Sequence, residues 1–273
     1  MPTLSLDCLT LTDSSPIELI EAAAAADFDL VSLWVNSPSA FPRMQMTSSL
    51  ERDCVRLLQD TGIGVHLLEV TDLSGEAAIR AYRPALERGA RLGGKAASAY
   101  HATNPDRSHV ADLLALFAEI AGEFGLEVVL EPVAMARTRT LAEAEALIRN
   151  SGANAGIVFD TLHLIRSGGG PAELAAIDPA LIRYVQLNDG LLRLPPDDWR
   201  DEAMSERLYL GDGEFPLAAI LDILPPDIPW GIETPSIRRT SAGMDANMQA
   251  GAAMASLRKA LAERKRPSGE DNR

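Results

Sequence analysis

The segment at residues 127–160 reads EVVLEPVAMARTRTLAEAEALIRNSGANAGIVFD and is the most informative about the fold. It opens with Glu127–Leu130 and closes with Ala155–Phe159, two largely apolar runs without alternation. Such runs are typical of parallel strands that are covered on both faces. A helical pattern, Thr140–Ile148, lies between them. The segment therefore predicts a strand–helix–strand unit.

The same alternation of short strand and helix recurs eight times along the chain. The predicted strands are Thr3–Leu9, Leu30–Val35, Gly64–Val70, Lys95–Tyr100, Glu127–Leu130, Ala155–Phe159, Tyr184–Leu187 and Pro229–Ile232. The predicted helices are Pro16–Ala25, Ser49–Thr61, Glu76–Gly89, Ser108–Phe124, Thr140–Ile148, Pro171–Ile177, Pro216–Ile223 and Met244–Arg264. Eight such units in 273 residues predict an α/β fold, a single (β/α)8 TIM barrel.

A doubly wound open sheet is the alternative fold, but no GxGxxG motif follows the first strand. We expect residues 1–264 to form the barrel and the polar residues 265–273 to form a disordered tail. The longest irregular stretch, residues 190–213, follows the seventh strand, and loops of that length are usually functional lids or rims.

The composition favours a globular protein that binds a small molecule. The chain has 39 Asp+Glu against 25 Lys+Arg, a net charge of −14, which repels phosphate backbones and argues against nucleic acid. No apolar run reaches the length of a membrane span, and the N-terminus lacks the features of a secretory signal. The two cysteines, Cys8 and Cys54, form no CxxC motif and are predicted to be buried, reduced thiols. We therefore expect a cytoplasmic protein that contacts no membrane.

Oxygen-bearing side chains lie at the ends of the last four predicted strands. In strand order they are Glu131, Asp160, Gln186 and Glu233. The carboxyl ends of the strands share one rim in a barrel, so these side chains should converge. Carboxylates that close together need protons, basic partners or a divalent cation, and oxygen ligands favour Mg²⁺ or Mn²⁺ over structural zinc. The pattern predicts a metal site with these four ligands, although each residue alone could be a helix cap or an ion-pair partner.

Two basic side chains are further candidates for the site. His163 lies three residues after Asp160, a spacing that allows the chain to turn into a loop and place the imidazole over the cavity, where it could transfer protons. Arg207 precedes the glycine-rich turn Gly211–Gly213, and its guanidinium could hold a substrate oxygen, carboxylate or phosphate. A capping or packing role for His163 and a surface role for Arg207 are the structural alternatives.

The first half of the chain is less informative. His101 ends the fourth predicted strand and Trp34 ends the second, so both are candidate substrate contacts, with ordinary packing as the alternative. Glu69, at the end of the third strand, would point to the same rim. His66 and His109 are interpreted as structural.

Taken together, these residues resemble the xylose isomerase-like TIM barrels. That family includes sugar phosphate isomerases and epimerases, ketose 3-epimerases, inosose dehydratases and 3-dehydroshikimate dehydratases. Its pattern is a strand-end Glu, an Asp-x-x-His, a His or Gln in strand seven, an Arg before a G-x-G turn and a Glu after strand eight. The matching residues here are Glu131, Asp160 with His163, Gln186, Arg207 and Glu233. The resemblance implies a Mn²⁺- or Mg²⁺-dependent enzyme in which Glu131, His163 or Glu233 removes the proton.

Gln186 leaves two reactions open. The third ligand in the epimerase branch is usually histidine, whereas glutamine resembles the bacterial 3-dehydroshikimate dehydratases. The leading hypothesis is an isomerase or epimerase that removes a proton next to the carbonyl of a polyhydroxylated keto compound. The alternative is a dehydratase of the 3-dehydroshikimate or inosose type.

Two other classes are less consistent with the sequence. An endonuclease IV-like DNA-repair enzyme would need several histidines for a multinuclear zinc site, and this chain has four histidines and a charge of −14. A binding barrel that has lost its metal is disfavoured by the intact Glu131, Asp160 and Glu233. Members of the family often form dimers or tetramers, so a homo-oligomer remains open.

Overall fold

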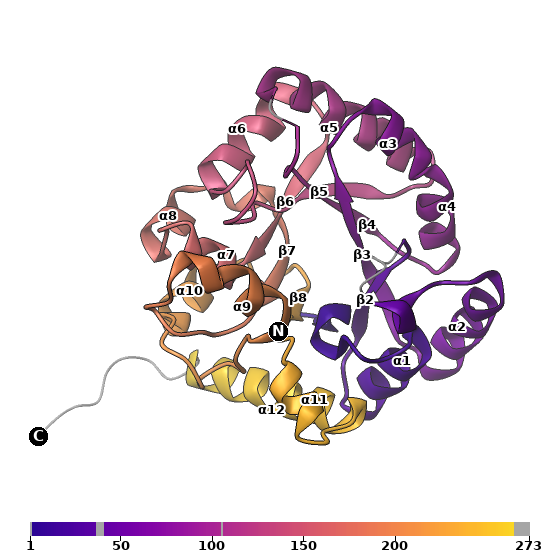
Figure 1. Ribbon diagram of the computed structural model, residues 1–273, viewed down its shortest axis with the longest axis vertical. Helices are drawn as coiled ribbons and strands as arrows, with labels where there is room; N and C mark the ends of the chain where they lie inside the picture. Colours follow the sequence, from indigo (N-terminus) through magenta and orange to yellow (C-terminus); the bar gives the residue numbers. More distant parts are fainter. Residues whose placement is uncertain (1, 37–40, 105, 265–273) are drawn as a thin grey trace, which may run out of the picture.

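The computed structural model describes residues 2–36, 41–104 and 106–264 of the chain. Eight parallel strands form one closed barrel in chain order, and helices surround it (Figure 1). The ring closes because β1 (Leu4–Leu6) pairs with both β2 (Leu30–Trp34) and β8 (Trp230–Ile232). The predicted (β/α)8 barrel is confirmed, and the open-sheet alternative is wrong.

The remaining strands are β3 (Gly64–Asp72), β4 (Ala96–Tyr100), β5 (Glu127–Leu130), β6 (Ala155–Asp160) and β7 (Ile182–Leu187). The helices are α1 (Pro16–Ala25), α2 (Ser48–Thr61), α3 (Glu76–Ala81), α4 (Arg83–Arg91), α5 (Arg107–Gly122), α6 (Leu141–Ser151), α7 (Thr161–Arg166), α8 (Pro171–Ala176), α9 (Trp199–Ser205), α10 (Leu217–Ile223), α11 (Ile237–Ser241) and α12 (Ala246–Arg264). Short 3-10 turns lie at Cys8–Leu11, Pro42–Met44, Pro179–Leu181 and Pro196–Asp198.

Local sequence signals explain where several helices begin and end. In α6, Thr140 caps the first turn and Glu143 returns a hydrogen bond to the backbone of Thr140, which is a capping box. Gly152 then ends α6 with a φ of 64°, a conformation that glycine adopts without steric cost. The strand–helix–strand unit predicted from residues 127–160 therefore forms with nearly the predicted boundaries.

Three predicted segments differ from the structure. The single helix expected at Glu76–Gly89 is two helices, α3 and α4, because Pro84 fits only a first helical turn. The loop expected after Asp160 is α7, which begins at the next residue. The stretch 190–213, predicted to be irregular, contains α9.

The strand alternation builds two layers of side chains inside the barrel. The lower layer contains an apolar cluster of Leu67, Ala96, Val129, Val158 and Tyr184. Side chains two residues further along a strand point to the same face. The upper layer is therefore occupied by Glu69, Ser98, Glu131, Asp160 and Gln186, each two residues after a member of that cluster.

Among the described residues, Cys8 and Cys54 are buried and free, as predicted. No helix in the described ranges has the length and apolar character that crossing a bilayer requires. The tail predicted at 265–273 lies outside the described residues.

Candidate active site

The structure brings the four predicted ligands to the carboxyl end of the barrel in two adjoining groups. The first group is Glu131, Asp160 and His163, each with a ligand atom within 4.8 Å of the others. The second group is Asp7, Glu69 and Glu233, by the same measure. We call them the first and the second carboxylate group. The single four-ligand cluster predicted from the sequence is thus divided, and Glu233 lies with two residues that were not predicted as ligands.

In the first group, the start of α7 positions the side chains. Asp160 Oδ1 accepts hydrogen bonds from the backbone N–H groups of Leu162, at 2.7 Å, and His163, at 3.3 Å. Asn188 Nδ2 donates to the same oxygen at 3.0 Å. His163 Nε2 lies 3.4 Å from Glu131 Oε1. His163 therefore projects from a helix rather than from the predicted loop, and Asp160 is a helix cap as well as a candidate ligand.

Gln186 contacts the second group through its side-chain amide. Its Nε2 donates to Glu233 Oε1 at 3.1 Å and to Glu69 Oε1 at 3.4 Å. Ser98 Oγ donates to Glu69 Oε2 at 3.1 Å. Gln186 is 1% exposed, and its Oε1 has no hydrogen-bond partner among the described residues. That carbonyl oxygen is available to a cation.

Arg207 joins the two groups. Its Nη1 lies 2.7 Å from Asp160 Oδ2 and 2.8 Å from Glu233 Oε2. Its Nε donates to the backbone oxygen of Ala203 in α9, at 2.9 Å. Because Arg207 is only 2% exposed, these are buried ion pairs whose charges have lost most of their hydration. The burial of Arg207 excludes the surface position considered as the alternative, and its predicted role as a substrate contact stays a prediction.

Burial is the largest single influence on the pKa values of these groups. It raises the pKa of Glu131 and of Glu233 well above the usual value, and it raises the pKa of Glu69 to about 7. Burial is also the largest single influence on the pKa of Asp160 and acts to raise it, but the charges of Arg207 and His163 and the hydrogen bonds from Asn188 and Arg207 together lower that pKa. Burial lowers the pKa of His163 to about 4, against the attraction of Asp160, so the imidazole is neutral at pH 7.

Two candidate substrate contacts lie elsewhere. His101 Nδ1 bonds Thr138 Oγ1 at 2.9 Å and its Nε2 bonds the backbone oxygen of Asn104 at 2.6 Å, so both ring nitrogens hold local structure. Trp34 is 7% exposed and packs on Phe41, with ring centroids 4.7 Å apart. Neither side chain belongs to the two carboxylate groups. For both residues the structure supports packing, the alternative considered from the sequence.

Asp7 was not predicted as a site residue, and Glu69 was predicted to lie at the rim without a role. The predicted first strand, Thr3–Leu9, ran past Asp7, which follows the end of β1. A usable signal was present, because side chains two residues apart in a strand point to the same face. Counting two residues from Ser5 and from Leu67 gives Asp7 and Glu69, on the inner face.

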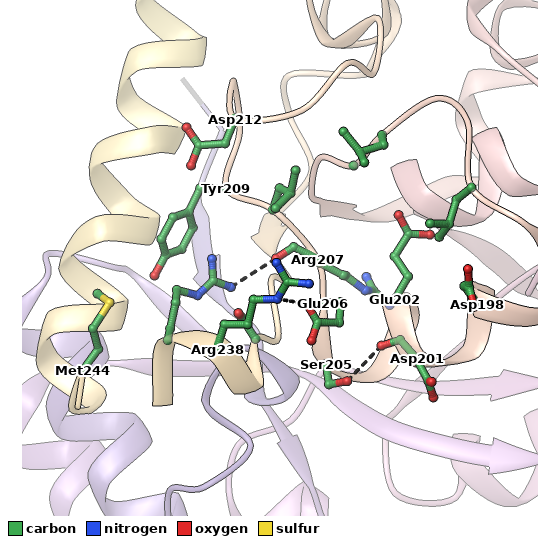
Figure 2. Close-up of a pocket in the computed structure, with 16 residues that line it drawn as sticks. Asp198, Asp201, Glu202, Ser205, Glu206, Arg207, Tyr209, Asp212, Arg238 and Met244 are labelled. Atoms are coloured by element: carbon green, nitrogen blue, oxygen red, sulfur yellow. Dashed lines mark hydrogen bonds and ion pairs between the residues drawn. The ribbon is translucent and has the colours of Figure 1, made fainter. Parts of the chain in front are cut away.

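A cavity of about 810 Å³ lies beside the barrel mouth, and Figure 2 shows it. Its lining comes from α9, from α11 and from the segment that joins α9 to α10, and it includes Arg207, Tyr209, Arg238 and Arg239. Arg207 also pairs with both carboxylate groups, so it stands between them and the cavity.

Comparison with known proteins identifies the family. A family model described as "Xylose isomerase-like TIM barrel" matches residues 20–260. The chain belongs to this family. The expected family membership is therefore confirmed.

Three relatives illustrate the range of this family. A 3-dehydroshikimate dehydratase from Pseudomonas aeruginosa is 28% identical over 231 residues, which are 80% of this chain. The chain spans only 35% of that relative's length. A structure of the IolI protein with a bound zinc atom has a TM-score of 0.81, with 17% identity over 96% of this chain and 99% of that one. An L-ribulose 3-epimerase structure has a TM-score of 0.72, with 19% identity over the whole of both chains.

The donor set of this xylose isomerase-like barrel fits a divalent cation. The two groups offer carboxylate oxygens and one imidazole, and the neighbouring Gln186 offers an amide oxygen, which together are donors that a divalent cation accepts. Asp7 Oδ2 and Gln186 Oε1 are buried and lack hydrogen-bond partners among the described residues, and a bound cation would satisfy such atoms. A cation shared by Asp160 and Glu233 would compete with Arg207 for the same oxygens.

Proposed function

We propose that this xylose isomerase-like barrel is a divalent-metal-dependent enzyme. It removes a proton next to the carbonyl group of a polyhydroxylated keto substrate. Glu131, Asp160, Gln186 and Glu233 would hold Mn²⁺ or Mg²⁺. When bound, the ion would polarise the substrate carbonyl and stabilise the charge that develops on its oxygen.

The Glu131–His163 pair is the observation that carries this proposal. Glu131 Oε1 lies 3.4 Å from His163 Nε2, and the Glu131 and His163 side chains are 12% and 5% exposed. Burial raises the pKa of Glu131 in the metal-free protein, and the charge of a bound cation would lower it, leaving a carboxylate that can accept a proton. Glu131 takes the substrate proton in this scheme, and the adjacent neutral imidazole passes it on.

His163 and Arg207 would orient the substrate. His163 Nδ1 is buried and has no hydrogen-bond partner among the described residues, so it can meet a substrate hydroxyl or carbonyl. Arg207 lines the cavity beside the barrel mouth and reaches Asp160 and Glu233 from there. Its guanidinium would exchange a carboxylate partner for a substrate oxygen.

The fate of the intermediate left after proton removal separates three reactions. Return of the proton to the same carbon from the opposite face gives epimerisation, and its delivery to the neighbouring carbon gives isomerisation. Loss of a β-hydroxyl gives dehydration. Gln186 and the similarity to a 3-dehydroshikimate dehydratase favour dehydration as the second candidate. An endonuclease IV-like site gains no support, because the two groups contain five carboxyl residues and one histidine.

Solvent-deuterium incorporation tests the proposal. The Mn²⁺-loaded protein would be incubated in D2O with ketoses, inososes and 3-dehydroshikimate, and the products analysed by mass spectrometry. Deuterium uptake without loss of mass supports an isomerase or epimerase, and loss of water supports a dehydratase. Absence of both with every substrate would refute the proposed chemistry. The single domain at 1–264, the cytoplasmic location and a homo-oligomer stay predictions.

A further inference from the structure

Two short helices hold the basic side chains that are proposed to contact the substrate. His163 lies within α7, which has six residues, and the Nε of Arg207 donates to the backbone oxygen of Ala203 in α9, which has seven. Isolated helices of this length are marginally stable in water, so tertiary contacts fix their positions. The contacts between α7 and α9 therefore bear on both basic side chains.

A buried ion pair links these two helices. Arg166 is the last residue of α7, and Glu202 lies in the first turn of α9, so each charge is at the helix end whose dipole favours it. Arg166 Nε donates to Glu202 Oε2 at 2.6 Å, and its Nη2 donates to Glu202 Oε1 at 2.5 Å. The two side chains are 2% and 7% exposed. This bidentate geometry fixes the direction of the link as well as its length.

The same guanidinium holds the beginning of the segment that contains α9. Arg166 Nη2 donates to the backbone oxygen of Leu191 at 2.6 Å, and its Nη1 lies 3.5 Å from that of Leu192. The guanidinium carbon lies 5.3 Å from the centre of the Phe215 ring. One side chain of α7 thus contacts the segment after β7 at its start, in α9 and near its end.

A glycine leaves room for the partners of Arg166. A Cβ built on Gly190 would lie 2.7 Å from Glu202 Oε1 and 2.8 Å from Phe215 Cζ. A side chain at this position would therefore displace two of the groups that surround the guanidinium. The first residue after Asp189 is thus compatible with the ion pair because it has no side chain.

The backbone and the guanidinium of Arg207 are held by different elements. Its N–H donates to the backbone oxygen of Pro235, at 3.0 Å, in the segment after β8. Its Nε is held from α9 instead, by Ala203, the residue after Glu202, and this leaves Nη1 facing both carboxylate groups. Glu202 and Arg207 also line the same cavity (Figure 2). A shift of α9 would thus turn the guanidinium without moving the backbone that carries it.

We propose that Arg166 and Glu202 are positioning residues that fix the direction of the Arg207 guanidinium. The pair holds α9 against α7, and Ala203 of α9 holds Arg207 Nε. This inference rests on the proposed function, in which Arg207 exchanges a carboxylate partner for a substrate oxygen. A pair that served only the stability of the fold would leave the interactions of Arg207 unchanged.

A double-mutant cycle in the metal-free protein tests the proposal. Arg166→Met/Glu202→Leu, which we call the pair variant, removes both charges together. Replacement of a buried ion pair by apolar residues of similar size is often neutral or stabilising, so this variant should fold. Arg207→Met is then introduced into the wild type and into the pair variant, and urea midpoints are measured with a chelator present. We expect Arg207→Met to lower the midpoint clearly less in the pair variant, because the guanidinium has already lost its fixed direction.

Equal midpoint shifts in the two backgrounds would overturn the positioning role, since independent sites are additive. Arg149→Met/Glu145→Leu removes an ion pair on the surface of α6 and is the matched control, which should leave the effect of Arg207→Met unchanged. Glu202→Gln is a second background, because glutamine keeps the size of the side chain and removes its charge. It should also reduce the effect of Arg207→Met.

Kinetics supply a readout that a structural role would not move. With the substrate found by deuterium incorporation, the pair variant should raise KM by roughly 10-fold at a nearly unchanged kcat. The reason is that a charge-assisted hydrogen bond, held equally in the ground and transition states, is weakened. An unchanged KM would overturn the positioning role. The cycle needs neither substrate nor metal, so additive shifts leave the proposed function standing, whereas absence of turnover with every substrate refutes that function alone.

Discussion

Replacement of Arg207 by methionine should destabilise the metal-free protein severely. The guanidinium pairs with Asp160 and Glu233, and the three side chains are 3%, 0% and 7% exposed. Methionine keeps much of the length of the side chain but leaves two buried carboxylates without their cation. Removing one partner from a buried ion pair typically costs about 3–5 kcal/mol, so we expect a loss of that size in the free energy of unfolding.

Urea denaturation in the presence of a chelator measures this loss. Arg149→Met is the control, since Arg149 pairs with Glu145 on the surface of α6 and is 59% exposed. An exposed pair of this kind contributes only about 0.2–1 kcal/mol. Added Mn²⁺ should recover part of the stability of Arg207→Met, because the ion takes the place of the guanidinium charge. A loss below about 1 kcal/mol for Arg207→Met would refute the bridging role.

Three further predictions concern neighbouring groups. His163→Gln should retain bound metal but lose turnover by about 10²-fold or more, since a proton-transfer group contributes on that order; unchanged kcat would remove His163 from the mechanism. Burial raises the pKa of Glu69 to about 7, so the metal-free native state binds more protons than the unfolded state above the ordinary pKa of 4.5. The stability contribution of Glu69 is therefore complete below pH 4.5 and lost as pH rises through 7, and Glu69→Gln should flatten this decline in urea midpoints; identical pH profiles would contradict it. Gly231→Ala should lower the free energy of unfolding by about 1–3 kcal/mol, because its Cβ would collide with the Asp7 carboxylate; Gly251→Ala, where nothing lies within 4 Å of the added Cβ, is the control and should show no loss.

The barrel could be predicted from the sequence because each strand has a recognisable local pattern. Apolar runs such as Val128–Leu130 need cover on both faces, and the capping residue Thr140 marks where the next helix begins. Helix breaks were harder to predict. Pro84 was read as part of one helix, although it fits the first turn of another.

The composition of the site was predictable only in part. Glu131, Asp160 and Glu233 were recognisable because each directly follows an apolar run. Their division into two groups depends on distances between strands, which no local pattern encodes. The contact between Arg207 and Asp160 joins residues 47 positions apart, and Asp7 was hidden inside a strand predicted too long.

The catalytic divalent ion proposed for this protein would be held by Glu131, Asp160, Gln186 and Glu233. Calorimetric titration of the chelator-treated protein with Mn²⁺ tests this ligand set most directly in Glu131→Gln, which keeps the size of the side chain and removes its charge. A rise in Kd of at least about 10-fold is expected in Glu131→Gln, the scale seen when even a supporting partner of a metal ligand is lost. The control Asp72→Asn should keep the wild-type Kd, because the Asp72 carboxylate binds Ala102 and Thr103 instead. An unchanged Kd in Glu131→Gln would contradict the proposed ligand set.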